Sequence, residues 1–330
     1  PSLDGLPSTY IEDDLEAKTL EIVMEDKLIG LEVTLIYTIY RDMDVIARSV
    51  KFKNYGKESL TLERALSASV DFRDKDFELI TLYGAHTNEK NIARRPIIFG
   101  IQMVESSRGA SSPQQAPFIA LVRKSTDEDH GEVYSFNFVY SGNFMAQVQV
   151  DQYCNTRVNM GLNDFDFSWL LDSGETFQTP EVIMTYSSKG LNEMSRTYHN
   201  LYLNRLCRGK FKNKHRPILI NNWEATFFDF NADKIEDFAK EAKNLGMELF
   251  VLDDGWFGKR NDDKSSLGDW FVDKNKLPKG LDDLVKKITD LGLEFGIWFE
   301  PEMISEDSNL YKIHPDWCLR VPSREPIVGR

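Results

Sequence analysis

The stretch that decides the fold of this 330-residue chain is Leu249-Phe250-Val251-Leu252-Asp253-Asp254-Gly255-Trp256. Four consecutive apolar residues without alternation predict a strand that is buried on both faces, as in a parallel sheet covered by helices. Two adjacent carboxylates, a glycine and a tryptophan follow this strand directly. Because parallel barrels carry their sites at the carboxyl ends of their strands, the stretch predicts part of a binding site.

The sequence around this strand alternates between strand and helix from Pro217 onward. The pattern predicts strands at 218–220, 249–253 and 294–299 and helices at 234–245, 281–291 and 308–313. Gly246 and Gly292 follow the first two helices, where a left-handed residue commonly ends a helix. Successive strands and helices of this kind are typical of an α/β barrel or of an open parallel sheet.

The length of this alternating segment decides between those two folds. A complete (β/α)8 barrel takes about 250 residues, whereas only about 115 residues follow Pro217. Three strands cannot close a barrel. An open doubly wound sheet is the alternative, but no glycine-rich phosphate loop follows the first strand. We therefore expect residues 217–330 to hold the first three βα units of a (β/α)8 TIM barrel, in a chain that is a fragment.

The first half of the chain has the period-two pattern of half-buried strands. Every odd position from 31 to 39 is apolar. Further β-rich runs lie at 45–52, 60–72, 97–104, 118–122, 133–138, 146–150 and 176–186. Many short strands without helical periodicity predict an antiparallel β-sandwich, or supersandwich, over residues 1–188. Apolar positions from Leu191 to Arg205 recur at helical spacing, so residues 189–216 are expected to form a helical linker.

The composition limits the class of partner. The net charge of −13 argues against nucleic acid or an anionic membrane, and the basic cluster at 208–216 is interpreted as solvated linker. No apolar run is long enough to span a membrane. Cys154, Cys207 and Cys318 are far apart and lack a CxxC pattern, which indicates a reducing compartment and no metal site. We therefore expect a cytoplasmic protein.

The ends of the three predicted strands carry the same chemistry. Carboxylates and tryptophans lie at the end of each strand or directly after it, at Trp223, Glu224, Asp253, Asp254, Trp256, Trp298, Glu300 and Glu302. Carboxylates accept hydrogen bonds from sugar hydroxyls, and tryptophan rings stack on sugar rings. A single residue of this kind can instead cap a helix or pack in the core. The repetition at three strand ends favours a carbohydrate site, and Gly255 lets the backbone turn so that both aspartates can face it.

The segment after Gly255 is long, acidic and rich in turns as far as Trp270. Long loops on the active face of a barrel are usually functional. A calcium loop is the alternative, but the spacing of the aspartates does not match the EF-hand pattern.

Four motifs of the chain resemble the bacterial α-galactosidases of glycoside hydrolase family 36. They are Asn221-Asn222-Trp223-Glu224-Ala225-Thr226-Phe227-Phe228, Leu252-Asp253-Asp254-Gly255-Trp256-Phe257-Gly258, Ser266-Leu267-Gly268-Asp269-Trp270 and Phe295-Gly296-Ile297-Trp298-Phe299-Glu300-Pro301-Glu302-Met303. Upstream, Ser106-Ser107-Arg108-Gly109-Ala110-Ser111-Ser112 also resembles the sandwich domain of that family. Pro113 stands where the family commonly has histidine.

The resemblance implies a sandwich, a helical connection and a catalytic (β/α)8 barrel. It implies retaining hydrolysis of terminal α-linked galactose from melibiose, raffinose or stachyose, without a metal or organic cofactor, often by a homotetramer. Asp253, Asp254, Trp223, Trp298 and Arg330 match substrate-binding residues of the family. Glu300, Glu302 and Trp256 are interpreted as supports behind the pocket.

The catalytic pair of the family is expected beyond Arg330. The nucleophile lies in a Lys-Trp-Asp segment on the fourth strand and the acid/base aspartate lies later, and neither segment occurs in this sequence. Asp253 or Asp254 with Glu300 could supply two carboxyl groups, but the resemblance assigns both aspartates to binding. We therefore expect this chain to be inactive alone. A non-catalytic galactoside-binding protein, an α-N-acetylgalactosaminidase and a raffinose-synthase-like transferase are the alternatives.

Overall fold

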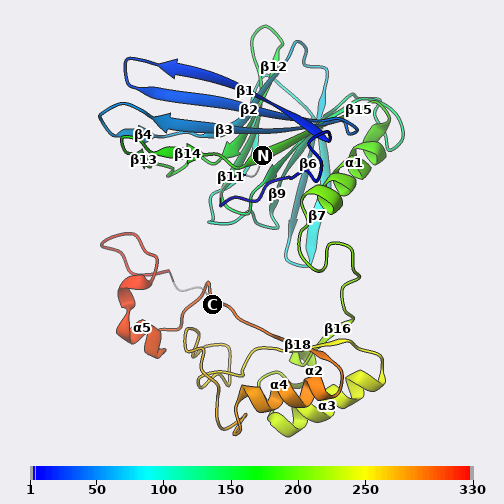
Figure 1. Ribbon diagram of the computed structural model, residues 1–330, viewed down its shortest axis with the longest axis vertical. Coiled ribbons are helices and arrows are strands. Elements are labelled where there is room, and N and C mark those ends of the chain that lie inside the picture. The colour runs from blue at the N-terminus through cyan, green and yellow to red at the C-terminus, as the bar shows by residue number, and fades with distance from the viewer. Residues whose placement is uncertain (1–2, 4, 328–330) are drawn as a thin grey trace. The chain divides into compact units, whose positions relative to one another are not determined.

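The computed structural model describes residue 3 and residues 5–327 of the chain. The chain divides into two compact units, Pro1–Lys212 and Asn213–Arg330 (Figure 1). No helix within the described residues has both the length and the apolar character that a membrane crossing requires.

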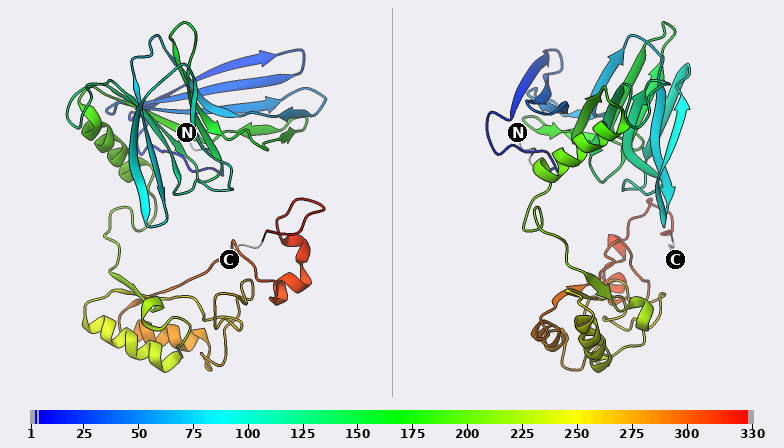
Figure 2. Two further views of the ribbon diagram at one scale, coloured as in Figure 1. Left: turned by 180° about the vertical axis from the view of Figure 1, so that it is seen from behind. Right: turned by 90° about the vertical axis from the view of Figure 1, so that its right-hand side faces the viewer.

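The first unit consists of antiparallel strands and one helix (Figure 2). Its elements are β1 (Ala17–Asp26), β2 (Leu31–Tyr40), β3 (Val45–Asn54), β4 (Leu60–Leu62), β5 (Leu66–Phe72), β6 (Glu78–Ala85), β7 (Asn88–Pro96), β8 (Gly100–Ser106), β9 (Gln115–Val122), β10 (Val133–Val139), β11 (Phe144–Val150), β12 (Thr156–Leu162), β13 (Trp169–Leu171), β14 (Thr176–Gln178), β15 (Glu181–Ser187) and α1 (Gly190–Arg205). A nine-stranded sheet has the order β1-β2-β3-β15-β10-β9-β6-β7 with β14 beside β3, and a four-stranded sheet has the order β5-β12-β11-β8. The pair β4 and β13 forms a two-stranded sheet.

The core of the first unit lies between the two larger sheets. Leu121 of β9 in one sheet and Met160 of β12 in the other belong to the same fully buried cluster. The neighbours of Leu121 on its strand, Ala120 and Val122, belong to a second cluster with Leu201 of α1. Because successive side chains of a strand point to opposite faces, one face of the sheet fills the sandwich while the other packs against α1.

The predicted antiparallel sandwich is confirmed, although some strand bounds differ. The run expected at 176–186 is two strands, because β14 ends at Gln178 and β15 starts at Glu181 after Pro180. Proline has no backbone N–H to donate to a ladder, so it separates strands. The run expected at 60–72 is likewise divided into β4 and β5. Strands β1, β6, β7, β12 and β13 were not predicted.

The second unit contains three parallel strands with helices between them. Its elements are β16 (Leu219–Asn221), α2 (Trp223–Thr226), α3 (Ala232–Asn244), β17 (Leu249–Leu252), α4 (Leu281–Asp290), β18 (Glu294–Ile297), α5 (Asn309–Ile313) and a 3-10 turn, η1 (Pro315–Trp317). The strand order β16-β17-β18 follows the chain. This arrangement confirms the predicted start of a βα barrel.

The central strand of this sheet is the predicted apolar run. Phe250 and Leu252 are completely buried, in one cluster with Ile235 of α3 and Ile288 of α4. Asn231 caps α3, because its side-chain oxygen accepts a hydrogen bond from the backbone N–H of Lys234 at 3.0 Å. The two helices cover the face of the sheet that carries Phe250 and Leu252. The predicted burial on both faces is wrong, because Leu249 and Val251 on the opposite face are only half-buried.

Candidate functional site

Parallel pairing brings the three strand ends to one edge of the small sheet. Asn221 lies opposite Val251, and Leu252 lies opposite Ile297. Two further hydrogen bonds tie the segments that follow the strands. The side-chain oxygen of Asn222 accepts from the N–H of Asp253 at 2.9 Å, and the carbonyl of Leu252 accepts from the N–H of Trp298 at 2.9 Å. Trp223, Asp253 and Trp298 therefore start from the same edge.

The two aspartates have different surroundings. Gly255 has a φ of 98°, so the backbone turns sharply directly after them. Asp253 is half-buried, and one of its carboxylate oxygens accepts from the N–H of Asp254 at 2.8 Å. Asp254 is 7% exposed. The turn thus leaves the carboxylate of Asp253 more accessible than that of Asp254.

Arg260 holds the carboxylate of Asp254 in a buried ion pair. Its Nε and Nη2 atoms donate to Oδ1 at 3.0 Å and to Oδ2 at 2.9 Å, and its Nη1 atom donates to the carbonyl of Ser265 at 2.8 Å. The side chains of Arg260 and Asp254 are only 3% and 9% exposed. A bidentate contact of this kind fixes both the position and the plane of a carboxylate.

Lys276 fixes the turn itself. Its buried ammonium donates to the carbonyls of Gly255 at 2.8 Å and Arg260 at 2.9 Å, and burial lowers the pKa of Lys276. The sequence carries no signal for Arg260 and Lys276, because basic residues in an acidic loop are normally exposed.

Burial also perturbs Asp253. It raises the pKa of the Asp253 carboxyl, and the negative charges of Asp254 and Glu224 raise this pKa further. The hydrogen bond from the Asp254 N–H acts in the opposite direction and lowers the pKa. Hydrogen bonds to a carboxylate favour its charged form. A ligand that offers hydroxyl groups to Asp253 would therefore offset the cost of holding its charge there.

The tryptophans at the strand ends are packed by other aromatic rings. The ring of Trp223 meets those of Phe227 and Phe228 edge to face, with centroids 5.2 Å and 5.0 Å away. Trp256 is 3% exposed and its Nε1 atom donates to the carbonyl of Trp298 at 3.0 Å. Trp256 thus supports the backbone at Trp298, and both Trp223 and Trp298 remain partly exposed.

The remaining predicted residues lie on the segment after β18 or further on. Glu300 is half-buried and Glu302 is exposed in the turn that follows β18. Arg330 lies outside the described residues. Among the described residues no group of three or more His, Cys, Asp or Glu side chains could hold a metal ion.

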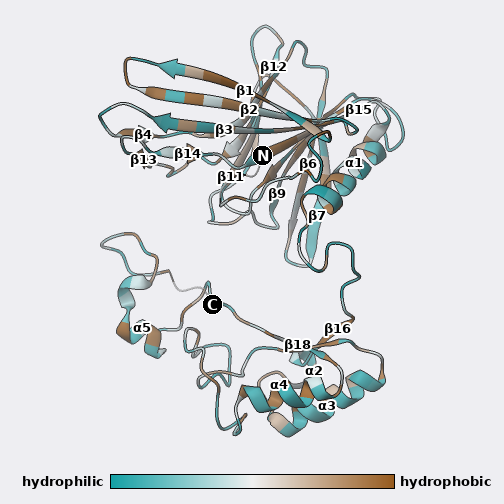
Figure 3. Cartoon of the chain, in the orientation of Figure 1, coloured by the Kyte–Doolittle hydropathy of each residue, from teal (hydrophilic) through white to brown (hydrophobic). Residues whose placement is uncertain are grey.

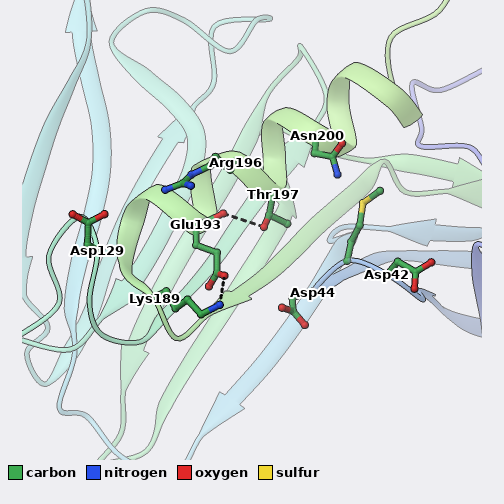
Figure 4. A pocket seen from close by; sticks show the side chains of 9 residues that line it. Asp42, Asp44, Asp129, Lys189, Glu193, Arg196, Thr197 and Asn200 are labelled. Atoms are coloured by element: carbon green, nitrogen blue, oxygen red, sulfur yellow. Dashed lines mark hydrogen bonds and ion pairs between the residues drawn. The ribbon is translucent and has the colours of Figure 1, made fainter.

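Two depressions in the first unit contain none of the predicted site residues. One, of about 570 Å³, is lined by Asp42, Met43, Asp44, Asp129, Lys189, Glu193, Arg196, Thr197 and Asn200 (Figure 4). Lys189 and Glu193, four residues apart at the start of α1, form an ion pair in its wall at 3.3 Å. No aromatic ring lines it, so it lacks a stacking surface for a sugar. The other, of about 430 Å³, is lined mostly by apolar and aromatic residues, Phe167, Trp169 and Phe177 among them.

Comparison with known families and proteins agrees with this architecture. Residues 1–172 match the glycosyl hydrolase family 36 N-terminal domain, and residues 176–330 match Melibiase. The chain is 61% identical to the α-galactosidase AgaA of Geobacillus stearothermophilus and 53% identical to the α-galactosidase Mel36A of Lactobacillus acidophilus, over 330 residues in both cases. All of this chain is matched, but it spans only 45% of each relative.

The solved structures that resemble this chain include those of an α-galactosidase. A crystal structure of AgaA superimposes with a TM-score of 0.97 over 100% of this chain and 46% of the AgaA chain. A variant of AgaA in complex with raffinose also gives 0.97, and one in complex with stachyose gives 0.96, both at 61% identity. An antiparallel sandwich followed by the first strands of a parallel barrel, with carboxylates and tryptophans at the strand ends, is the architecture that this chain shares with these glycoside hydrolases. The chain belongs to glycosyl hydrolase family 36.

Proposed function

We propose that this chain is the N-terminal part of an α-galactosidase, an enzyme that hydrolyses terminal α-linked galactose from oligosaccharides such as melibiose and raffinose. The observation that carries the proposal is the convergence of Trp223, Asp253 and Trp298 on one edge of a parallel sheet, where the carboxylate is partly desolvated. Relatives named α-galactosidases, at 61% and 53% identity, support it.

Asp253 and Asp254 bind the galactose hydroxyls in this proposal. The carboxylate of Asp254 is oriented by Arg260 before any ligand arrives, so little ordering is needed on binding. A carboxylate has about four acceptor positions. Three contacts from Arg260 leave part of this capacity for a sugar hydroxyl. Trp223 and Trp298 line the pocket, with Arg330 as a further substrate contact and Trp256, Glu300 and Glu302 as supports.

The bond-breaking step is assigned to residues beyond 330. Retaining hydrolysis needs a nucleophile and an acid/base, two carboxyl groups about 5–5.5 Å apart. With Asp253 and Asp254 assigned to the sugar hydroxyls, this chain binds galactose weakly and does not turn over a galactoside. We further propose that the protein is a cytoplasmic homo-oligomer, a tetramer in its full length. Its sandwich spans residues 1–188, its linker 189–216 and its barrel segment 217–330.

Two assays on the 330-residue chain test these assignments. Titration calorimetry with galactose is expected to show binding that Asp253→Asn weakens, and a chromogenic α-galactoside is expected to show no turnover. Turnover that Asp254→Ala abolishes would contradict the claim that this chain is inactive alone. An absence of galactose binding would contradict the placement of the sugar at these strand ends.

Assays of a longer product of the same gene distinguish the alternative functions. A protein that carries a Lys-Trp-Asp strand after Arg330 and hydrolyses the galactoside supports the hydrolase. One that only binds is a galactoside-binding protein. Competition between galactose and N-acetylgalactosamine for binding tests the α-N-acetylgalactosaminidase. The ratio of transfer to water to transfer to a sugar acceptor tests the transferase.

A further inference from the structure

The depression of about 430 Å³ in the first unit, the aromatic depression, has Phe167, Trp169 and Phe177 in its lining. None of the strand-end residues of the second unit contributes to it. Small-molecule sites have volumes of about 300–1,000 Å³ and are lined mainly by apolar and aromatic side chains, with a few placed polar groups. The aromatic depression has this volume and this composition, and Asn143 and Asp166 are among its polar residues.

Aromatic rings support one another along this depression. The ring of Phe177 on β14 lies 5.1 Å from that of Trp169 on β13 and 5.9 Å from that of Phe167, between centroids. It also packs on Phe52 of β3 at 6.5 Å. Figure 3 shows hydrophobic and hydrophilic residues mixed in the region of β13 and β14. Trp169 is 48% exposed although these rings support it. Such a ring is free to stack on the apolar face of a sugar.

The loop before β13 is anchored to the sandwich. The Nδ2 atom of the buried Asn163 donates to the carbonyls of Ser106 at 3.1 Å and Phe144 at 3.3 Å. Its Oδ1 atom accepts from the N–H of Phe165 at 3.0 Å. Asp166, at the turn of this loop, has a φ of 54°, a left-handed conformation that aspartate tolerates better than most residues. A loop held in this way loses little conformational freedom when a ligand binds.

The polar residues of the lining keep hydrogen-bonding groups free. The Oδ1 atom of Asn143 accepts from the N–H of Gly109 at 2.6 Å, so its Nδ2 group is left as a donor. Within the described part of the chain, neither this Nδ2 group nor the carboxylate of Asp166 has a hydrogen-bond partner. The same holds there for the Oε1 atom of Gln178 and for the hydroxyl of Tyr140. The lining therefore offers both donors and acceptors, as the hydroxyl groups of a sugar require.

The segment 106–112, which the strand-end site does not use, orients the amide of Asn143. Gly109 has a φ of 83°, so the backbone turns there in a conformation that favours glycine. The N–H of Ser111 donates at 2.7 Å to the carbonyl of Ser141, two residues before Asn143. Because both segments are joined by this bond and by the bond from Gly109, the nitrogen of Asn143 is held available.

We propose that the aromatic depression binds a pyranose unit of an oligosaccharide. The ring of Trp169 stacks on the apolar face of the sugar, the carboxylate of Asp166 accepts from its hydroxyls, and the Nδ2 group of Asn143 donates to a hydroxyl oxygen. An apolar ligand is disfavoured, because it would take these polar groups out of water without replacing their hydrogen bonds. The proposal concerns the first unit alone and does not depend on the proposed hydrolase activity.

Fluorine NMR of the 330-residue chain labelled with 5-fluorotryptophan tests the proposal. The chain has six tryptophans, and Trp169→Phe assigns the resonance of Trp169. Raffinose is added up to about 50 mM, which is sufficient to detect a Kd near 1 mM. The titration is made in the native chain and in Asp253→Asn, whose strand-end site is expected to be impaired. We expect a saturable shift of the Trp169 resonance in both chains, and no such shift with glycerol at the same concentrations. No shift at Trp169, or an equal shift with glycerol, overturns the proposal.

Isosteric substitutions then test the two polar contacts. Asp166→Asn keeps the shape and the left-handed turn, and Asn143→Asp keeps the acceptor for Gly109 but removes the donor. Each is expected to raise the Kd for raffinose at Trp169 about three- to tenfold.

Asp164→Asn is the matched control. Asp164 lies on the same loop but outside the lining, and it forms an exposed ion pair with Arg64 at 3.3 Å. Its substitution should leave the Kd unchanged, so an equal effect of Asp164→Asn and Asp166→Asn would refute the placement of the sugar. In the native chain, a shift at Trp223 or Trp298 without one at Trp169 would refute this proposal and leave the proposed hydrolase intact.

Discussion

Removal of Arg260 is expected to destabilise the second unit strongly, because it leaves the carboxylate of Asp254 buried without its partner. Breaking one side of a buried ion pair costs about 3–5 kcal/mol. The pair meets that description, since its side chains are 3% and 9% exposed and joined at 2.9 Å. Domains are stable by only about 5–15 kcal/mol, so Arg260→Met should lose a large part of the total.

The unfolding of this unit can be followed within the intact chain. Of the six tryptophans, only Trp169 lies in the first unit, so tryptophan fluorescence in urea reports mainly the second. The exposed pair of Lys286 and Asp290 is the matched control, with side chains 74% and 63% exposed. Its loss in Lys286→Met should change the free energy of unfolding by at most about 1 kcal/mol.

A double-mutant cycle separates the ion pair from other effects of the substitution. Asp254→Asn combined with Arg260→Met removes both charges of the pair, so the double variant should be less destabilised than the sum of the single variants. The expected coupling is about 2–3 kcal/mol. A loss for Arg260→Met no greater than that for Lys286→Met, or a coupling near zero, would refute the reasoning that Arg260 holds Asp254.

Three further predictions concern the same unit. The pKa of Asp253 is raised in the folded state, so ionisation of its carboxyl opposes folding above that pKa. Asp253→Asn should therefore be more stable than the native chain at neutral pH. The difference in stability should shrink as the pH falls toward about 4. Urea unfolding at several pH values measures this, and an asparagine variant less stable at pH 7 would contradict it. Trp298→Ala should weaken galactose binding about tenfold or more in calorimetry, through a lost stacking contact, whereas the exposed Trp317→Ala should leave it unchanged; equal effects would count against Trp298 in the pocket. Asn231→Ala should cost about 1 kcal/mol in urea unfolding because it removes the cap of α3, and no loss would show that the cap bond is not needed.

The packed parts of the fold could be predicted from sequence because their patterns have a physical cause. The unalternated run at 249–252 forms the predicted strand, but only Phe250 and Leu252 on one face are completely buried, whereas Leu249 and Val251 on the other face are half-buried. The strand ends at Leu252 rather than at the predicted Asp253, because the N–H of Asp253 bonds to the side chain of Asn222. Such a contact depends on a residue 31 positions away and leaves no periodic signal.

The positions of the candidate site residues could be predicted only in part from the sequence. The shared chemistry of the strand ends indicated which residues meet at one edge. The buried network of Arg260 and Lys276 could not be predicted, because a charged residue looks the same in sequence whether it is exposed or paired inside a loop. The same holds for β1, whose mixture of Lys18, Glu21 and Glu25 with apolar residues hides its alternation. The roles of Asp253, Asp254, Trp223, Trp298 and Arg330 in binding stay predictions.

A crystal structure of the chain soaked with galactose tests the central claim most directly. We expect the sugar at the carboxyl edge of β16, β17 and β18, with hydroxyl oxygens about 2.5–3.0 Å from the carboxylates of Asp253 and Asp254 and with its ring against Trp223 or Trp298. Galactose bound elsewhere, for example in the aromatic depression beside Trp169, with both aspartates free of sugar contacts, would contradict the assignment of the site.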